Sequence, residues 1–500
     1  LYDKYMAEIS RLDGDGLLVR RNKALSWASI AGQLRVELDK AQTPEEIGRI
    51  FARVDAAYPN LHAHINLSPK YDYRGKTRVG LPISVYPEEI KEDGSIPTFR
   101  IGGARKEFFS TDLRPKSGDV LLSINGRTIQ EWAKENIEFC KYPLASQCHI
   151  EFFRNFKMEL LSWNRSQKLS IDVLRKGETL SFSVPITLDE VSKAPHDNTQ
   201  TCRVENERYL NFQLAYEGRN LCAYESKNHP AVAVLRLNSF NYRKDNHPIQ
   251  SISEDAREFE QKYWLRNKSR LKTVVIDLID NYGGDKSLAW LSTFLAEPYQ
   301  EQWVEIKNIK ELQSPDWRKI SFYGEAAKEK HFHRFASAEF LPPIPQFCPP
   351  IGNCSEHLWP VREKPFMGQY IFLLNHDCIS SCVGFAWTMK NYLKERLFVA
   401  GIPDSGDSTY ARAYIQGALL DKAPFYQVTT TPQAHGSHAR ANFSGVFQQA
   451  VSISMSTNAR GEIISGRPLS VNLFLAPTWQ QTPDEWVSSL LEKVLVSVPR

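Results

Sequence analysis

Four short and almost continuous apolar runs constrain the fold of this 500-residue chain more than any other feature. They are residues 231–237, 273–279, 370–374 and 396–400. Strands that are apolar on both faces are typical of a parallel sheet covered by helices. Residues 253–268 and 381–395 have the helical spacing expected of such helices. The sequence therefore predicts an α/β core over residues 231–500.

The overall composition excludes several classes of protein. With 42% apolar and 24% charged residues, the chain has the composition of a globular protein, and its length predicts about three domains. The 62 basic and 58 acidic side chains leave a net charge of +4, which gives no electrostatic reason to expect nucleic acid or an anionic membrane as a partner. No run approaches the roughly 18 apolar residues that a membrane span requires.

Two further regions flank an insert ahead of this core. Residues 1–82 are predicted to be mainly helical, with Thr43-Pro44-Glu45-Glu46 as a helix start. The alternating run 61–67 within this region is predicted to be a strand. Residues 189–230 are polar, and we interpret them as a connector to the core.

The insert between these regions, residues 83–188, consists of short β-branched runs and turns. In it, Gly118-Asp-Val-Leu-Leu-Ser-Ile-Asn-Gly126 combines a turn, an apolar strand and a tight Asn-Gly turn before a predicted helix. An ordinary hairpin explains the Asn-Gly turn alone. The whole composite resembles the second half of a PDZ module, which binds extended peptides by adding them to a sheet edge. The resemblance implies a PDZ-like domain over residues 83–188.

The eight cysteines fall into near pairs, which are Cys140 and Cys148, Cys202 and Cys222, Cys348 and Cys354, and Cys378 and Cys382. An even, paired set permits disulfides and an exported location. No pair has the Cys-x-x-Cys spacing of a zinc site, so no metal is predicted. Because the paired cysteines permit disulfides, we expect a periplasmic or secreted protein.

The segment Leu374-Asn-His-Asp-Cys-Ile-Ser-Ser-Cys382 places two serines between a buried strand and a helix. A serine at a helix N-terminus faces unpaired backbone N–H groups and the positive end of the helix dipole. That environment suits a nucleophile whose reaction passes through an oxyanion. Taken alone, however, Ser380 and Ser381 are explained more simply as N-cap residues.

A second segment, Asp277-Leu-Ile-Asp-Asn-Tyr-Gly-Gly284, ends another buried strand in a glycine pair. Glycines let backbone N–H groups approach a ligand closely. The alternative is an ordinary turn from strand to helix. A phosphate-binding loop is excluded because the Gly-x4-Gly-Lys spacing is missing.

Together these segments resemble the motifs of the tail-specific (C-terminal processing) serine protease family. That family typically carries Asp-Leu-Arg-x-Asn-Pro-Gly-Gly and, further along the chain, Ser-Ala-Ser-Ala-x-Glu. Here Tyr282 replaces the proline, and Cys378-Ile-Ser-Ser-Cys-Val383 replaces the run of small residues. The resemblance implies a crotonase-like (ClpP/crotonase type) α/β protease core that needs no cofactor.

The same resemblance assigns roles to individual residues. It implies Ser381 as the nucleophile. It also implies an oxyanion hole formed by the backbone N–H groups of Gly283 and Cys382, with Gly284 as a further part of it.

The general base distinguishes two branches of the family. Most members use a lysine in the loop that corresponds to residues 401–409, where this chain has none, and Lys390 and Lys394 lie along the helix after the serine. A smaller branch, similar to the chlamydial protease-like activity factor and the tricorn-type proteases, uses Ser, His and Glu. His62 occupies the place of that histidine, and His64 is the alternative. An imidazole suits a general base near neutral pH, although a structural histidine pair would also explain the motif.

The third member of the site is less well defined. The position aligned with the family's glutamate is Ser465, and Glu462 lies just before it. Either Glu462 orients the histidine in a shifted register, or another acid does, or the site is a Ser–His dyad.

The resemblance as a whole implies a serine endopeptidase that hydrolyses peptide bonds of protein substrates. The PDZ-like domain would bind part of the substrate, and a homodimer is left open. The alternative is a peptide-binding pseudoprotease on the same scaffold, since the lysine is missing and the glutamate is displaced.

Overall fold

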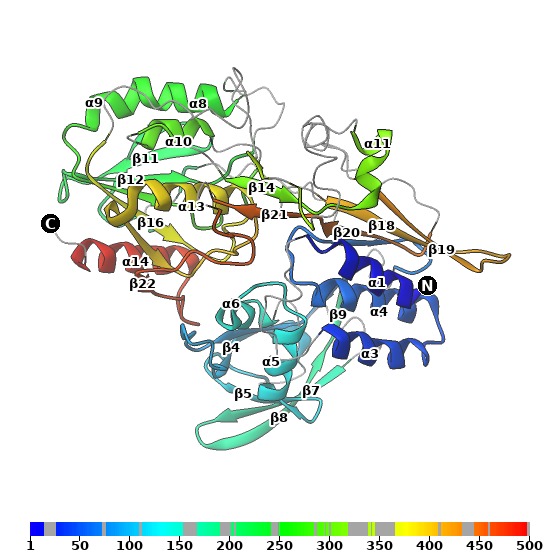
Figure 1. Cartoon of the computed structure of the whole chain (residues 1–500). Coiled ribbons are helices and arrows are strands. Elements are labelled where there is room, and N and C mark those ends of the chain that lie inside the picture. The colour runs from blue at the N-terminus through cyan, green and yellow to red at the C-terminus, as the bar shows by residue number, and fades with distance from the viewer. Residues whose placement is uncertain are drawn as a thin grey trace.

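The structure, a computed structural model, describes most of the chain. The described residues are 1–14, 27–72, 77–109, 113–153, 168–190, 202–204, 207–241, 249, 251–284, 288–295, 297–299, 302–318, 339–341, 343–345, 366–408, 412–432, 445–458 and 461–497. Helices and strands alternate around several sheets, so the predicted α/β class is confirmed (Figure 1).

The largest sheet has seven strands in the order β10-β11-β12-β13-β16-β17-β22. Their bounds are β10 Gln213–Glu217, β11 Leu221–Glu225, β12 Val232–Leu237, β13 Thr273–Asp277, β16 Gln369–Leu374, β17 Leu397–Gly401 and β22 Leu473–Phe474. The strands from β12 to β22 are parallel, and β10 and β11 are added antiparallel. The four apolar runs are thus neighbouring strands, while β10 and β11 come from the predicted connector.

Helices cover both faces of this sheet. The helices α8 (Ile252–Phe259), α10 (Leu288–Phe294) and α13 (Ser381–Leu393) pack on one face, and α14 (Pro483–Ser497) packs on the other (Figure 1). Alternate residues of β13 enter the two cores, with Val274 and Ile276 on the first side and Val275 on the second. This alternation explains why the strand is apolar along its whole length.

The N-terminal region is helical, as predicted, but it shares a sheet with the other end of the chain. Its helices are α1 (Tyr2–Leu12), α3 (Trp27–Leu38) and α4 (Pro44–Ala57). α4 begins at the predicted helix start, where Thr43 and Glu46 form a capping box. They pack on a sheet with the order β1-β20-β18-β19, formed by β1 Ile65–Leu67, β20 Phe447–Ser452, β18 Arg412–Leu419 and β19 Tyr426–Pro432. The rings of Phe51 and Phe447 stack at a centroid distance of 4.6 Å, which joins α4 to β20.

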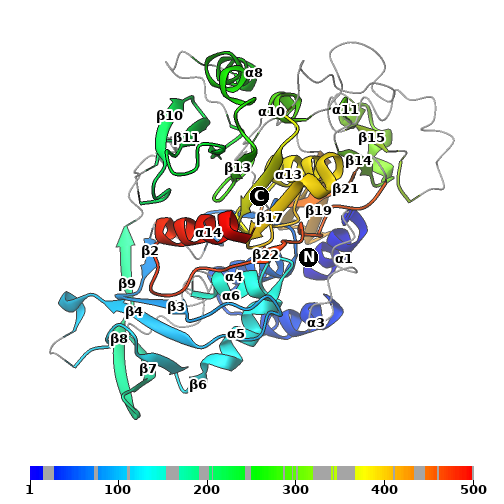
Figure 2. The same ribbon diagram turned by 90° about the vertical axis from the view of Figure 1, so that its left-hand side faces the viewer.

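The insert forms a β-sheet with a core of its own. Its strands follow the order β3-β4-β5-β7-β8, with β6 paired to β5, and its helices are α5 and α6. Their bounds are β3 Ile83–Pro87, β4 Phe99–Ala104, β5 Val120–Ile124, β6 Arg127–Thr128, β7 Lys168–Arg175, β8 Glu178–Pro185, α5 Ile129–Glu138 and α6 Ala145–Ile150. The predicted tight turn lies between β5 and β6, where Asn125 and Gly126 have positive φ angles of 51° and 75°. In Figure 2 the insert lies on the opposite side of the molecule from α8.

Smaller elements complete the described fold. Two strands pair with each other, β2 Thr77–Gly80 and β9 Thr187–Glu190. A three-stranded sheet consists of β14 Trp303–Ile306, β15 Ile344–Pro345 and β21 Ser454–Thr457. The short helices are α9 Leu265–Asn267, α11 Pro315–Arg318, the π-helix Glu260–Trp264 and the 3-10 helices Lys106–Phe108, Lys310–Gln313 and Lys394–Arg396.

Three of the four cysteine pairs are disulfides. These are Cys140–Cys148, Cys202–Cys222 and Cys378–Cys382, and the fourth pair, Cys348 and Cys354, lies outside the described residues. Disulfides fit a protein that functions outside a reducing compartment. Among the described helices, none is both long enough and apolar enough to cross a membrane.

Candidate active site

Four parallel strands of the large sheet end at one edge, and the segments that follow them lie at or beside the candidate site. Phe240 follows β12, Gly283 and Gly284 follow β13, Ser381 follows β16, and the loop 402–408 follows β17. The carboxyl ends of parallel strands are where α/β proteins bind their ligands. The topology therefore gathers segments that are distant in the sequence.

The predicted nucleophile lies at a strained turn. Ser381 is the first residue of α13 and is 8% exposed, and Ser380 before it has φ 62° and ψ −123°. A residue other than glycine in this part of conformational space costs about 1–3 kcal/mol, and such strain concentrates at functional sites. The Ser381 hydroxyl donates a hydrogen bond to the carbonyl oxygen of Gly284 at 2.8 Å. The structure thus brings together the two segments singled out from the sequence.

Both glycines of the second segment are required by close backbone contacts. Gly283 has φ 77°, and a Cβ atom there would lie 2.4 Å from the carbonyl oxygen of Ile379 and 2.8 Å from the Ser380 Cβ. Gly284 has φ 146°, and a Cβ atom there would lie 2.4 Å from the carbonyl carbon of Phe240. Any side chain at either position would push the glycine loop away from its neighbours.

The two N–H groups expected to form the oxyanion hole already have acceptors. The Gly283 N–H donates to Asn281 Oδ1 at 2.9 Å, and the Cys382 N–H donates to the carbonyl oxygen of Ile379 at 3.1 Å. An oxyanion at this place must therefore share or replace these two acceptors.

His62 lies in a turn that the side chain of Asn60 shapes. Asn60 Oδ1 accepts the N–H groups of His62 at 2.9 Å and Ala63 at 2.8 Å. This local bonding competes with strand pairing, so the predicted strand over 61–67 is limited to Ile65–Leu67. His62 and His64 therefore lie ahead of the strand.

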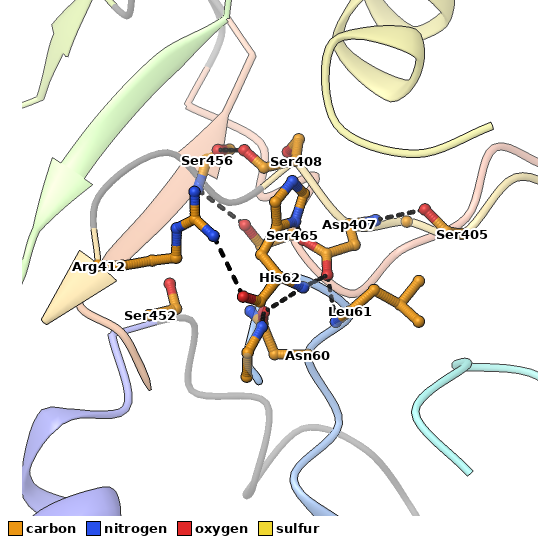
Figure 3. Close-up of polar contacts among 12 residues, drawn as sticks. Asn60, Leu61, His62, Ser405, Asp407, Ser408, Arg412, Ser452, Ser456 and Ser465 are labelled. Atoms are coloured by element: carbon orange, nitrogen blue, oxygen red, sulfur yellow. Dashed lines mark hydrogen bonds and ion pairs between the residues drawn. The ribbon is translucent and has the colours of Figure 1, made fainter. Parts of the chain in front are cut away.

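The carboxylate that holds His62 belongs to Asp407, which is 2% exposed. Asp407 Oδ1 lies 2.8 Å from His62 Nδ1, and Oδ2 accepts the backbone N–H of Leu61 at 2.5 Å (Figure 3). A carboxylate accepts the Nδ1 proton, which leaves Nε2 as the proton-accepting nitrogen. The Asp407 carbonyl oxygen accepts the N–H of Ser380 at 2.7 Å, so the same residue touches the histidine and the nucleophile turn.

The structure places the other candidates elsewhere. Glu462 is exposed and its carboxylate accepts a hydrogen bond from Asn458 at 2.6 Å, so its described contacts do not reach His62. The ring of His64 lies 3.2 Å from the His62 carbonyl oxygen. Ser465, the position aligned with the family's glutamate, accepts the N–H of Ser456 through its hydroxyl.

Of the two lysines after the serine, Lys390 lies in the last turn of α13 and Lys394 directly follows the helix. The second of them, Lys394, caps the far end of the 13-residue helix, about 20 Å from Ser381. Among the described residues, no group of three or more His, Cys, Asp or Glu side chains is arranged to hold a metal ion.

Sequence reasoning left the orienting acid open and did not name Asp407. A signal was present, because Asp407 follows a parallel strand that neighbours the nucleophile strand, and the carboxyl ends of such strands meet.

The insert contacts both loops that lead into this site. Gln147 of α6 donates to the carbonyl oxygens of Pro403 and Asp404, each at 2.8 Å. Glu151 pairs with buried His376 at 3.0 Å. Burial alone lowers the pKa of His376, but the carboxylates of Glu151 and Asp377 outweigh it, and the pKa is raised.

Asp404 is a second buried titrating group near the site. Burial raises its pKa to about 7, although the N–H groups of Gly406 and Leu469 bond its carboxylate and oppose that rise. The loop that carries Asp407 thus contains a carboxyl group that titrates near neutral pH.

No family model and no curated protein sequence matches this chain. Solved structures do match over its whole length. Mature CPAF (chlamydial protease-like activity factor) in complex with lactacystin matches with a TM-score of 0.60 and 14% identity, covering 99% of this chain and 97% of CPAF. A second structure of mature CPAF matches with a TM-score of 0.58 and 14% identity, covering 98% of this chain and 95% of CPAF. A structure of a CPAF mutant matches with a TM-score of 0.62 and 12% identity, covering 100% of this chain and 98% of the mutant chain.

The chain has the fold of CPAF. The predicted resemblance is therefore confirmed at the level of the fold. Identity of 12–14% carries the comparison no further, so the activity has to be argued from the residues of this chain.

Proposed function

We propose that the protein is a serine endopeptidase that uses Ser381 as nucleophile and His62 as general base. The observation that carries the proposal is the position of Asp407, whose carboxylate holds His62 Nδ1 while its carbonyl oxygen holds the N–H of Ser380. This proposal replaces Glu462 by Asp407 as the orienting acid.

The reaction follows from these contacts. The Ser381 hydroxyl turns from the Gly284 carbonyl oxygen towards His62 Nε2, and its oxygen forms a bond to the substrate carbonyl carbon as its proton passes to Nε2. Asp407 stabilises the imidazolium that results. The peptide C–N bond then breaks as Nε2 returns the proton to the leaving amine. A water molecule hydrolyses the acyl-enzyme by the same proton transfers.

The oxyanion forms beside the glycine loop and the first turn of α13. The N–H groups of Gly283 and Cys382 stabilise it once they leave Asn281 Oδ1 and the Ile379 carbonyl oxygen. Gly284 contributes by positioning the loop, because its backbone lies directly against Phe240.

The other regions fit protein substrates. The insert is proposed to be a PDZ-like domain, and the large sheet with its helices a crotonase-like core. The succession of β5, the Asn125-Gly126 turn and α5 supports a PDZ-like insert. The strand β3 supports it too, because it lies at the edge of its sheet, where a peptide strand can be added. The three disulfides support a periplasmic or secreted location.

A pseudoprotease that only binds peptides is the second candidate. The observation that favours it is that the Ser381 hydroxyl and both proposed oxyanion donors have acceptors within the protein. In this alternative the active-site loops stay in the described conformation when peptide binds.

Labelling with a fluorophosphonate probe separates the two candidates. We expect the wild type to be labelled, and labelling to be lost in Ser381→Ala and to fall about 1000-fold or more in His62→Ala, with both variants folded. Labelling that survives in His62→Ala but not in His64→Ala would move the base to His64. Wild type that stays unlabelled across pH 6–9 while it binds peptides would establish the pseudoprotease.

A further inference from the structure

The disulfide Cys378–Cys382 encloses the proposed nucleophile. Its two half-cystines flank Ser380 and Ser381, and their Cα atoms are 5.2 Å apart. Cys378 precedes the strained turn, whereas Cys382 lies in the first turn of α13 and supplies a proposed oxyanion donor. Both are fully buried in the core between the large sheet and its helices.

Hydrogen bonds continue from this disulfide to the orienting acid. The Cys378 carbonyl oxygen accepts both the N–H and the hydroxyl of Ser405, at 3.1 and 3.0 Å. The Ser405 hydroxyl oxygen in turn accepts the N–H of Asp407 at 3.1 Å (Figure 3). Since Asp407 accepts the N–H of Ser380, these contacts form a ring that the main chain closes through Ile379, and the disulfide adds a second covalent link across the same turn, from Cys378 to Cys382.

The ring has a mechanical consequence for the nucleophile. The backbone conformation of Ser380 is unfavourable for an isolated chain and persists only where its surroundings impose it. Without the cross-link, the turn could relax towards an ordinary N-cap conformation. Such a relaxation moves the Ser381 hydroxyl and the Cys382 N–H together, and a displacement of about 1 Å can cost about 100-fold in rate.

We propose that the Cys378–Cys382 disulfide positions the nucleophile, so that the chain is an active protease only when this bond is formed. The inference rests on the proposed function. A two-electron reduction by a dithiol would break the S–S bond, place a thiol on each cysteine and convert the dithiol to a cyclic disulfide. Because both sulfurs are buried, exchange requires local opening, and the bond is set mainly during folding. A chain that folds under reducing conditions would thus stay inactive until local opening in an oxidising compartment allows the bond to form.

The test compares two disulfides that are both buried. Cys378→Ala/Cys382→Ala removes the bond at the nucleophile, and Cys202→Ala/Cys222→Ala removes a buried bond that packs with α14 on the other face of the sheet. The second bond closes a loop of 20 residues against 4, so its loss should lower the thermal midpoint more.

We expect the first variant to lose about 10- to 100-fold in kcat and in the rate of fluorophosphonate labelling, with KM nearly unchanged. The control should keep its kcat within about twofold although its thermal midpoint falls further. A first variant that is folded and has kcat within about twofold of wild type would overturn the proposal. If wild type is not labelled at all, the proposed function itself fails.

A second measurement uses the wild-type chain in case the variant does not fold. The protein is refolded in buffers of graded dithiol-to-disulfide ratio, free thiols are alkylated, and each cysteine pair is followed by mass spectrometry. Activity is expected to follow the oxidised fraction of Cys378–Cys382 and not that of the other pairs. Full activity in molecules with Cys378 and Cys382 alkylated would overturn the proposal.

Discussion

The two sides of the candidate active site are built in different ways. Ser381 and the glycine pair lie at the ends of neighbouring parallel strands, so local sequence patterns and one sheet edge place them. His62 comes from the N-terminal region and meets Asp407, which is 345 residues away in the chain. The nucleophile side is therefore set by the core sheet, and the base side depends on long-range tertiary contacts, chiefly those of Asp407 with His62 and Leu61. We therefore expect a substitution at Asp407 to lower the proposed activity more than it lowers the stability of the fold.

The largest effect is expected from Asp407→Asn, which breaks the contact between the two sides. The amide would favour the wrong tautomer of His62 and could not stabilise the imidazolium, so kcat should fall about 1000- to 10,000-fold. Steady-state cleavage of a peptide substrate measures this.

Glu462→Gln is the matched control for this substitution. Its carboxylate bonds Asn458 at the surface, so we expect activity within about twofold of wild type. A large loss in Glu462→Gln with little loss in Asp407→Asn would restore Glu462 as the orienting acid.

On the nucleophile side, Gly283→Ala should lower kcat about 100-fold. The new methyl group would collide with the Ile379 carbonyl oxygen and displace the turn that carries Ser381. Gly126→Ala in the insert is the control, because Gly126 also has a positive φ, 75°, but no atom lies within 4 Å of the position that its new Cβ atom would take. The control should lose only about 1 kcal/mol of stability and keep its kcat. Equal kcat losses in both would show that backbone strain, not the contact with the turn, matters.

On the base side, Asn60→Ala should lower kcat about 10-fold and destabilise the fold by about 1–2 kcal/mol. It removes the buried acceptor of two backbone N–H groups that shape the turn of His62. Asn66→Ala, in β1 of the same segment, is the control and should change kcat less than twofold. Thermal unfolding and peptide cleavage distinguish this outcome from a purely structural loss, in which stability falls and kcat does not.

The smallest effect concerns the contact between the insert and the core. The pKa of His376 is raised in the folded state, so its pairing with Glu151 contributes stability that is fully present below about pH 6.5 and is lost as the pH rises through the raised pKa. Glu151→Gln should therefore destabilise the protein by about 1 kcal/mol more at pH 5.5 than at pH 9. Urea unfolding at the two pH values measures this difference. Glu258→Gln, at the exposed pair with Lys262, should show no such pH dependence, and an equal loss for Glu151→Gln at both pH values would contradict the assignment.

Much of the fold follows from the sequence because its signals are local. The apolar runs specify β12, β13, β16 and β17, and the capping box at Thr43 specifies the start of α4. β10 escaped prediction because it is a largely exposed edge strand without an apolar run. β11 is buried between β10 and β12, but its apolar run of Leu221 to Tyr224 is short and lies within a polar region. No local pattern in the sequence predicts that β1 of the N-terminal region pairs with β20 in one sheet.

For the site, the sequence by itself suggested Ser381 and the glycine pair, because their two segments resemble motifs of a protease family in which particular residue types recur at particular spacings. Only the tertiary structure decided that Asp407 holds His62, that Glu462 lies with Asn458, and that the proposed oxyanion donors already have acceptors. The physical reason is that a hydrogen bond between side chains depends on distances of a few tenths of an ångström across residues remote in the chain. Packing of the sheets, and not any local pattern, sets those distances.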